Sequence, residues 1–142
     1  IVSIEAMNRY LSVNLPKIFK NHNFEIIKER PTKSIFINGV EVIVSPDIIY
    51  LMEHNEEMYI GAVKLHMSKG NIFDVSKCSN VATLIYMYLE ELSDRYGAKV
   101  LPELCFSYDV FGGRFISAKG INRKSQRKIL KICDEVKLLW NA

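Results

Sequence analysis

Two segments with the character of β-strands, joined by a short polar turn, restrict most strongly what this chain can fold into. The first segment is Ser45–Tyr50, the second is Ile60–Leu65, and the polar turn between them is Glu53–Glu57. The second segment is almost wholly apolar, which is typical of a strand covered on both faces. Such a strand lies in the middle of a sheet, so further strands and covering helices must accompany the two segments.

The N-terminal half of the chain predicts one helix and several strands. Apolar residues recur at helical spacing from about Ile4 to Asn21, and Pro16 should kink or split that helix. Phe24–Glu29 and Ser34–Ile37 are typical of strands. Asn38-Gly39 then predicts a hairpin, because both residues tolerate positive φ. We expect one further strand from Val40 to Leu51, locally broken at Pro46.

The C-terminal half predicts helix, two strands and helix. A helix is expected over Asn80–Arg95 and should end near Gly97. Strands are expected over Val100–Val110 and Arg114–Ala118. A last helix should begin at an Asn122 cap, run to about Trp140, and face inward through Ile129, Leu130, Ile132, Cys133 and Val136. This order indicates an α/β (α+β) fold in which helices pack on a mixed sheet.

Composition limits the classes of protein that remain. The 142 residues are 49% apolar and 25% charged, so we expect one globular domain over 1–142. The chain starts without Met, which we interpret as a processed, trimmed or excised domain. No apolar run approaches the roughly 20 residues of a membrane span. The three widely spaced cysteines, Cys78, Cys105 and Cys133, predict buried reduced thiols and hence a cytoplasmic location.

Pro46-Asp47 on one strand and Lys64 on the next, followed directly by a helix, resemble the PD-(D/E)xK, or restriction-endonuclease-like, nuclease superfamily. The resemblance covers roughly Ile4 to Ala118 and implies a restriction-endonuclease-like core. It further implies a nuclease that uses Mg²⁺ or Mn²⁺. Asp47 would bind the metal together with the backbone carbonyl of Val63, and Lys64 would orient or help deprotonate the attacking water.

Ala62 departs from that pattern, because the family places its second carboxylate at this position. The resemblance allows another acid to replace it, and Glu5 on the first helix or Asp74 after the second strand are the candidates, with Glu90 and Glu91 further along. Loss of activity, an engineered knockout and ordinary core packing are three interpretations of Ala62 that the sequence leaves open.

Basic residues in the second half of the chain are candidates for contacts with a nucleic-acid backbone. Net charge is only +3, but basic residues gather near the C-terminus. We predict phosphate contacts, with DNA favoured over RNA, from Lys69, Arg123, Lys124, Arg127 and Lys128. A solvated helix face is the alternative interpretation of this cluster.

Three functions therefore compete. The first is a metal-dependent nuclease, and the second is a non-catalytic module of the same fold that binds nucleic acid or assembles with a second copy or other protein subunits. The third is an unrelated α+β interaction domain in which Asp47 and Lys64 coincide by chance.

Overall fold

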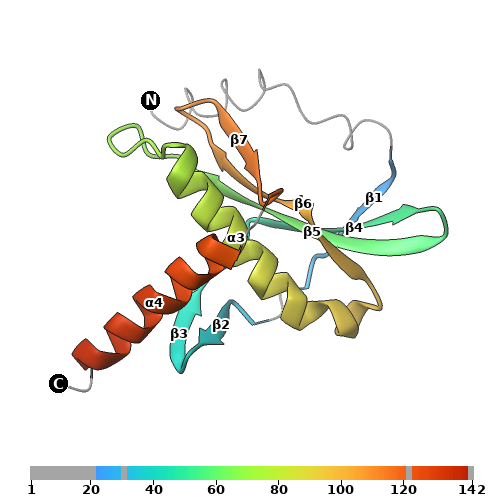
Figure 1. Ribbon diagram of the computed structural model, residues 1–142. Coiled ribbons are helices and arrows are strands. Elements are labelled where there is room, and N and C mark those ends of the chain that lie inside the picture. The colour runs from blue at the N-terminus through green and yellow to red at the C-terminus, as the bar shows by residue number, and fades with distance from the viewer. Residues whose placement is uncertain (1–21, 30–31, 121–122, 141–142) are drawn as a thin grey trace.

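The computed structural model describes residues 22–29, 32–120 and 123–140, and its centre is a five-stranded mixed sheet (Figure 1). The strand order is β1-β4-β5-β6-β7, in which β5 and β6 are parallel and all other neighbours are antiparallel. β5 is the middle strand, as its apolar sequence predicts. The strands are β1 (Phe24–Ile26), β4 (Ile48–His54), β5 (Glu57–His66), β6 (Lys99–Asp109) and β7 (Arg114–Ser117).

A separate two-stranded hairpin, β2 (Ser34–Ile37) and β3 (Val40–Ile43), confirms the turn predicted at Asn38-Gly39. Both turn residues have positive φ, 51° at Asn38 and 78° at Gly39. The single strand predicted over Val40–Leu51 is wrong. The chain leaves the hairpin after Ile43 and enters the large sheet only at Ile48, because four irregular residues carry it from one sheet to the other.

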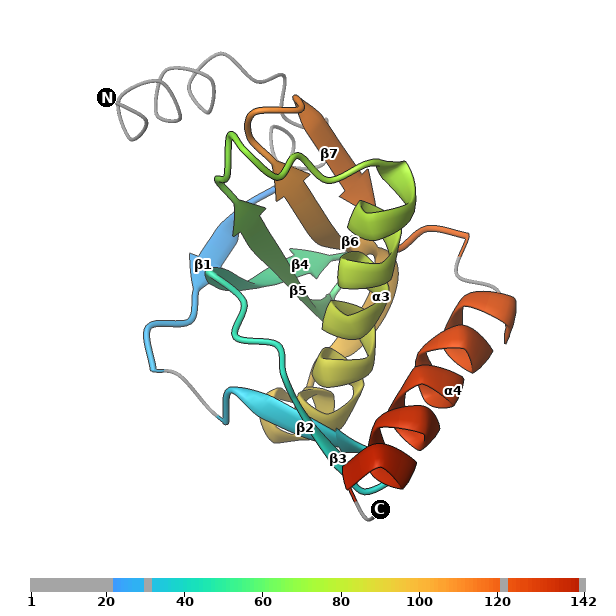
Figure 2. The same ribbon diagram turned by 90° about the vertical axis from the view of Figure 1, so that its left-hand side faces the viewer.

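Helix α3 (Val75–Leu92) follows β5 and lies across one face of the sheet (Figure 2). It begins five residues earlier than the periodicity predicts, because Asp74 caps it and accepts a hydrogen bond from Lys77 N. A 3₁₀ turn, η1 (Ser93–Tyr96), follows the helix. Gly97 then stops it with a left-handed conformation at φ 60°, as expected.

The last helix, α4 (Arg123–Trp140), packs on α3 and on β3 rather than on the sheet (Figure 2). Ile129 and Cys133 are buried as predicted, whereas Ile132 and Val136 are 48% and 39% exposed. The predicted inward position was therefore wrong for Ile132 and Val136. The contacts of α4 with α3 and the β2–β3 hairpin cover a narrower part of the helix surface than a sheet face would. The predicted first helix and the Asn122 cap lie outside the described residues.

Apolar side chains fill both faces of the sheet. On the α3 face, Ile49 and Ala62 pack with Ile85 and Leu89 of the helix. A second cluster on the opposite face includes Tyr50, Val63 and Tyr108. The three cysteines are buried and carry free thiols, as the sequence predicts. Residues of β5 therefore alternate between two buried layers, and the layer beneath α3 holds Ala62 and Lys64.

Candidate active site

Asp47 forms hydrogen bonds with the two residues that flank Lys64 along β5. The Asp47 N–H donates to the carbonyl oxygen of Val63 at 2.9 Å, and the Asp47 carboxylate accepts from Leu65 N at 2.7 Å. Val63 and Leu65 are the two neighbours of Lys64 along β5. The aspartate is thus bonded to β5 through its backbone and its side chain, and its carboxylate faces the lysine.

The charged groups of Asp47 and Lys64 lie 3.9 Å apart at a half-open position, and we call them the Asp47–Lys64 pair. Their side chains are 40% and 36% exposed respectively. The Lys64 ammonium also donates to the carbonyl oxygen of Ser45 at 3.0 Å. Two fixed oxygens therefore hold the ammonium, while solvent can still reach both charged groups.

The conformation of the irregular segment before Asp47 places the Ser45 carbonyl oxygen within hydrogen-bond distance of the Lys64 ammonium. Ser45 has a φ of 38°, a left-handed conformation that costs a residue with a side chain on the order of 1 kcal/mol. The N–H groups of Val44 and Ser45 both donate to Lys33 O, at 2.9 and 3.0 Å, which fixes the segment in this conformation. Backbone strain next to a charged pair is typical of functional sites.

The other predicted metal ligands take different positions. Ala62 is fully buried beneath α3. The Val63 carbonyl accepts the Asp47 N–H, so one of its two acceptor positions is used by the strand pairing. Asp74 caps α3, and Glu90 and Glu91 lie roughly 25 Å further along that helix, at about 1.5 Å per residue. Glu5 lies outside the described residues.

The predicted nucleic-acid contacts divide into exposed and undescribed side chains. Lys69 is exposed in the loop between β5 and α3, and Arg127 and Lys128 are exposed on α4. Arg123 and Lys124 form the start of α4, and their side chains are outside the described part. The loop that carries Lys69 and the helix α4 therefore form two separate surfaces. The loop follows the end of β5, whereas α4 lies on the far side of α3 (Figure 2).

A buried polar cluster beside the Asp47–Lys64 pair escaped the sequence analysis. The register of β5 and β6 pairs Lys64 with Ser107 and His66 with Asp109, so these four side chains share the α3 face. Asp109 and Ser107 are buried, at 0% and 1% exposure. The only sequence signal is the polar alternation within the otherwise apolar strand β6, and it does not indicate the partner strand.

The Cys78 thiol of α3 interacts with this cluster, and its pKa is raised. Burial is the main cause and the Asp109 charge adds to it, while the Ser107 hydroxyl and the Arg114 guanidinium act in the opposite direction. The thiol is therefore protonated near neutral pH, where it is a poor nucleophile. This excludes Cys78 as an activated thiol and leaves the carboxylate, ammonium and imidazole groups as the chemistry of this face.

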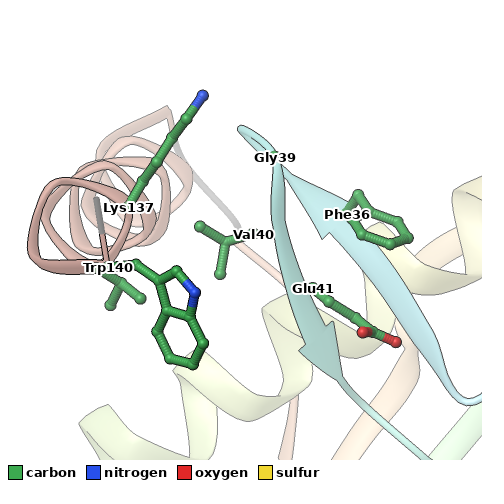
Figure 3. A pocket seen from close by; sticks show the side chains of 7 residues that line it. Phe36, Gly39, Val40, Glu41, Lys137 and Trp140 are labelled. Carbon is green, nitrogen blue, oxygen red and sulfur yellow. The ribbon is translucent and has the colours of Figure 1, made fainter.

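A groove of about 510 Å³ lies elsewhere, between the β2–β3 hairpin and the end of α4. Figure 3 shows Val40 pointing into this groove toward the Trp140 indole, with Phe36 on the neighbouring strand. Its lining includes neither Asp47 nor Lys64, and the hairpin lies at the opposite end of α3 from the helix start (Figure 2). The groove is therefore not part of the candidate site.

Within the described residues, no three His, Cys, Asp or Glu side chains lie close enough together to bind one metal ion. No helix of that part is long and apolar enough to cross a membrane. No family model, curated protein or solved structure matched this chain.

Proposed function

We propose that this chain is a metal-dependent nuclease of the restriction-endonuclease-like kind, with the Asp47–Lys64 pair at its centre. The supporting observation is that Asp47 is bonded to the two neighbours of Lys64 on β5, which brings its carboxylate to 3.9 Å from the ammonium. The five-stranded mixed sheet, with α3 running between its two parallel strands, agrees with this assignment. Three hydrogen bonds join the segment 45–47 to β5 around Lys64.

The donor set fits a hard divalent cation. A carboxylate offers about four acceptor positions, and Leu65 N–H uses one of them on Asp47. Mg²⁺ and Mn²⁺ sites commonly use one or two carboxylates and leave the remaining positions to water and to substrate oxygens. When bound, such a metal neutralises charge on the phosphodiester and makes a water molecule more acidic.

In this proposal, Lys64 binds a phosphate oxygen or orients the attacking water. Its ammonium has three N–H donors, and the Ser45 carbonyl takes one of them at 3.0 Å. A second donor faces the Asp47 carboxylate, and the 36% exposure leaves the third for a phosphate oxygen or the attacking water. Because Ser45 and Asp47 fix the ammonium, little side-chain entropy is lost when the substrate binds.

Exposed basic side chains would hold the nucleic acid through its phosphates. Lys69 lies in the loop that follows the strand of Lys64, and Arg127 and Lys128 lie on α4. Such contacts carry no sequence information and weaken steeply as salt rises. We propose DNA as the substrate, with binding that depends on ionic strength.

A non-catalytic module of the same fold is the second candidate, and Ala62 favours it. The residue is fully buried in the apolar layer under α3, where a carboxylate would be costly without a metal. This module would bind nucleic acid in a salt-sensitive manner without needing a metal and without cutting. The two candidates therefore differ in one observable, which is cleavage in the presence of a divalent ion.

The test is a cleavage assay on single- and double-stranded DNA with Mg²⁺ or Mn²⁺, comparing the wild type with Asp47→Asn and Lys64→Met. The exposed Lys99–Glu57 ion pair, at 2.9 Å, supplies the matched control Lys99→Met. We expect cleavage to fall by at least about 100-fold in the two site variants and to persist in the control. Cleavage that persists in folded Asp47→Asn would refute the nuclease assignment at this site. Salt-sensitive binding without cleavage by the wild type would favour the non-catalytic module.

A further inference from the structure

We propose that His66 is the second metal-binding side chain of the Asp47–Lys64 site, and that it coordinates through Nδ1. The proposal rests on the proposed nuclease function and names the group that takes the place of the acid missing at Ala62. Lys64 and His66 project from the same face of β5, because side chains alternate along a strand. The Asp47 carboxylate accepts from Leu65 N, the residue between Lys64 and His66 along β5, and lies 3.9 Å from the Lys64 ammonium.

The hydrogen bond of the imidazole leaves Nδ1 as the nitrogen with a lone pair. His66 Nε2 lies 2.5 Å from the carbonyl oxygen of Asn71. A carbonyl only accepts, so Nε2 carries the proton, and in the neutral ring Nδ1 keeps its lone pair. Among the described residues, Nδ1 has no hydrogen-bond partner. Metal-binding histidines characteristically donate their other ring N–H to a carbonyl or a carboxylate in this way.

The imidazole is also held in one orientation. It stacks on Phe73 with ring centroids 3.5 Å apart and an angle of 8° between the planes. The Phe73 carbonyl in turn accepts from the Arg114 guanidinium at 3.0 Å, which ties the loop before α3 to β7. The stacking contact fixes the face of the imidazole and the hydrogen bond to Asn71 fixes its edge. The ring is therefore preorganised, so less entropy is lost when a ligand binds.

Asp109 lies next to the imidazole, where a carboxylate can orient a metal-binding histidine. One of its oxygens accepts from Gly112 N at 2.9 Å, and the other, Oδ1, lies 4.0 Å from His66 Nε2. Oδ1 is buried without a hydrogen-bond partner among the described residues. A fully buried carboxylate is expensive, and orienting a functional histidine is a physical reason to keep it.

Gly112 allows the backbone to approach the Asp109 carboxylate closely. A Cβ at position 112 would overlap Asp109 Oδ2 and would lie 2.5 Å from the Arg114 guanidinium. Only glycine therefore allows the N–H of this turn to approach the carboxylate so closely. Asp109 is a positioning residue in this arrangement, and His66 is the residue that touches the metal.

One carboxylate and one imidazole define a metal preference. Imidazole nitrogen suits transition metals, whereas Mg²⁺ prefers oxygen ligands throughout. The site should therefore bind Mn²⁺ more tightly than Mg²⁺, and the difference should depend on His66. Removing the imidazole should leave a weaker, all-oxygen site at Asp47.

The test is calorimetric titration of the whole chain with MnCl₂ and separately with MgCl₂. Asp47→Asn, His66→Gln and Asp109→Asn are compared with His54→Gln, an exposed histidine at the opposite end of β4 and β5. We expect His66→Gln to weaken Mn²⁺ binding about 10-fold or more, Asp109→Asn to weaken it by about 10-fold, and His54→Gln to leave it unchanged. Mg²⁺ affinity should change little in His66→Gln.

The outcomes separate this inference from the proposed function. If Asp47→Asn loses Mn²⁺ and His66→Gln binds it as the wild type does, the inference is overturned and the nuclease assignment stands. If the wild type binds no Mn²⁺, both are overturned. Should His66→Gln fail to fold, histidine NMR of the wild type decides, because substoichiometric Mn²⁺ should broaden the His66 ring signals and spare those of His54. Equal broadening, or none, overturns the inference.

Discussion

Gly61 in the centre of β5 is the position where one methyl group should damage the fold most. Gly61 faces Tyr50 directly in the antiparallel pairing of β4 and β5. The Tyr50 ring crosses over the glycine, and its hydroxyl donates to Leu104 O of β6 at 2.7 Å. A Cβ at position 61 would overlap the Tyr50 ring and would lie 2.5 Å from the Leu104 oxygen. Gly61→Ala therefore forces both the Tyr50 side chain and the β6 backbone at Leu104 away from position 61.

The magnitude follows from two costs. Overpacking a filled core costs roughly 1–3 kcal/mol. Losing the Tyr50 hydrogen bond leaves the buried Leu104 carbonyl without its partner, which costs about 1–3 kcal/mol more. We expect Gly61→Ala to lower the free energy of unfolding by about 3–5 kcal/mol. For a chain of this length, the melting temperature should fall by roughly 10–15 °C.

Urea unfolding followed by far-UV circular dichroism is the suitable assay, because Trp140 is 87% exposed and reports poorly on the core. Gly70→Ala is the matched control, since a Cβ there meets no atom within 4 Å. It should change stability by no more than about 0.5 kcal/mol. A double-mutant cycle with Tyr50→Ala should recover about 1–3 kcal/mol of coupling. A Gly61→Ala variant as stable as the wild type would refute the crossing of Tyr50 over β5.

Three further predictions concern the surroundings of the site. Asp74→Ala should cost about 1 kcal/mol in thermal melts, because α3 loses the cap on Lys77 N, and an equal melting temperature would contradict the capping role. Gly112→Ala should cost about 1.5–3 kcal/mol by displacing the Asp109 carboxylate, whereas Gly113→Ala, which meets no atom within 4 Å but has φ 66°, should show only a backbone strain of about 1 kcal/mol. Burial raises the pKa of the Cys105 thiol, so the unfolded chain releases this proton at lower pH than the folded chain does. Stability should therefore fall as pH rises above about 8.5, by up to about 1.4 kcal/mol per pH unit for this thiol. Urea titrations in reductant should show a shallower fall in Cys105→Ala, and an unchanged pH dependence would contradict this assignment.

Local signals in the sequence predicted the regular elements of the fold well. Asn38-Gly39 indicated the hairpin because only residues that tolerate positive φ fit that turn. The apolar stripe of α3 and the mostly apolar run of β5 likewise follow from periodicity and burial alone. The break after Ile43 could not be predicted from local signals. It depends on Val44 and Ser45 bonding to Lys33, a contact that exists only once the hairpin stands apart from the sheet.

Part of the candidate site could likewise be predicted from local signals, and part of it could not. Asp47 directly precedes β4 and Lys64 lies on β5, so the short turn between these antiparallel strands fixes their register and sequence spacing is informative. His66 and Asp109 lie on parallel strands separated by all of α3. Their register includes a bulge in β6, where Ile60 pairs with Val100 but Ala62 pairs with Cys105. No spacing rule gives the length of such a bulge, so only the folded chain shows which residues meet.

Anomalous diffraction from crystals soaked in Mn²⁺ tests the central claim most directly, because it locates the metal without reference to activity. The account predicts one strong peak within about 2.5 Å of an Asp47 carboxylate oxygen, beside Lys64, which disappears in Asp47→Asn crystals. A peak elsewhere, or one that remains at the same place in Asp47→Asn, would contradict the assignment of the Asp47–Lys64 pair as a metal-dependent nuclease site.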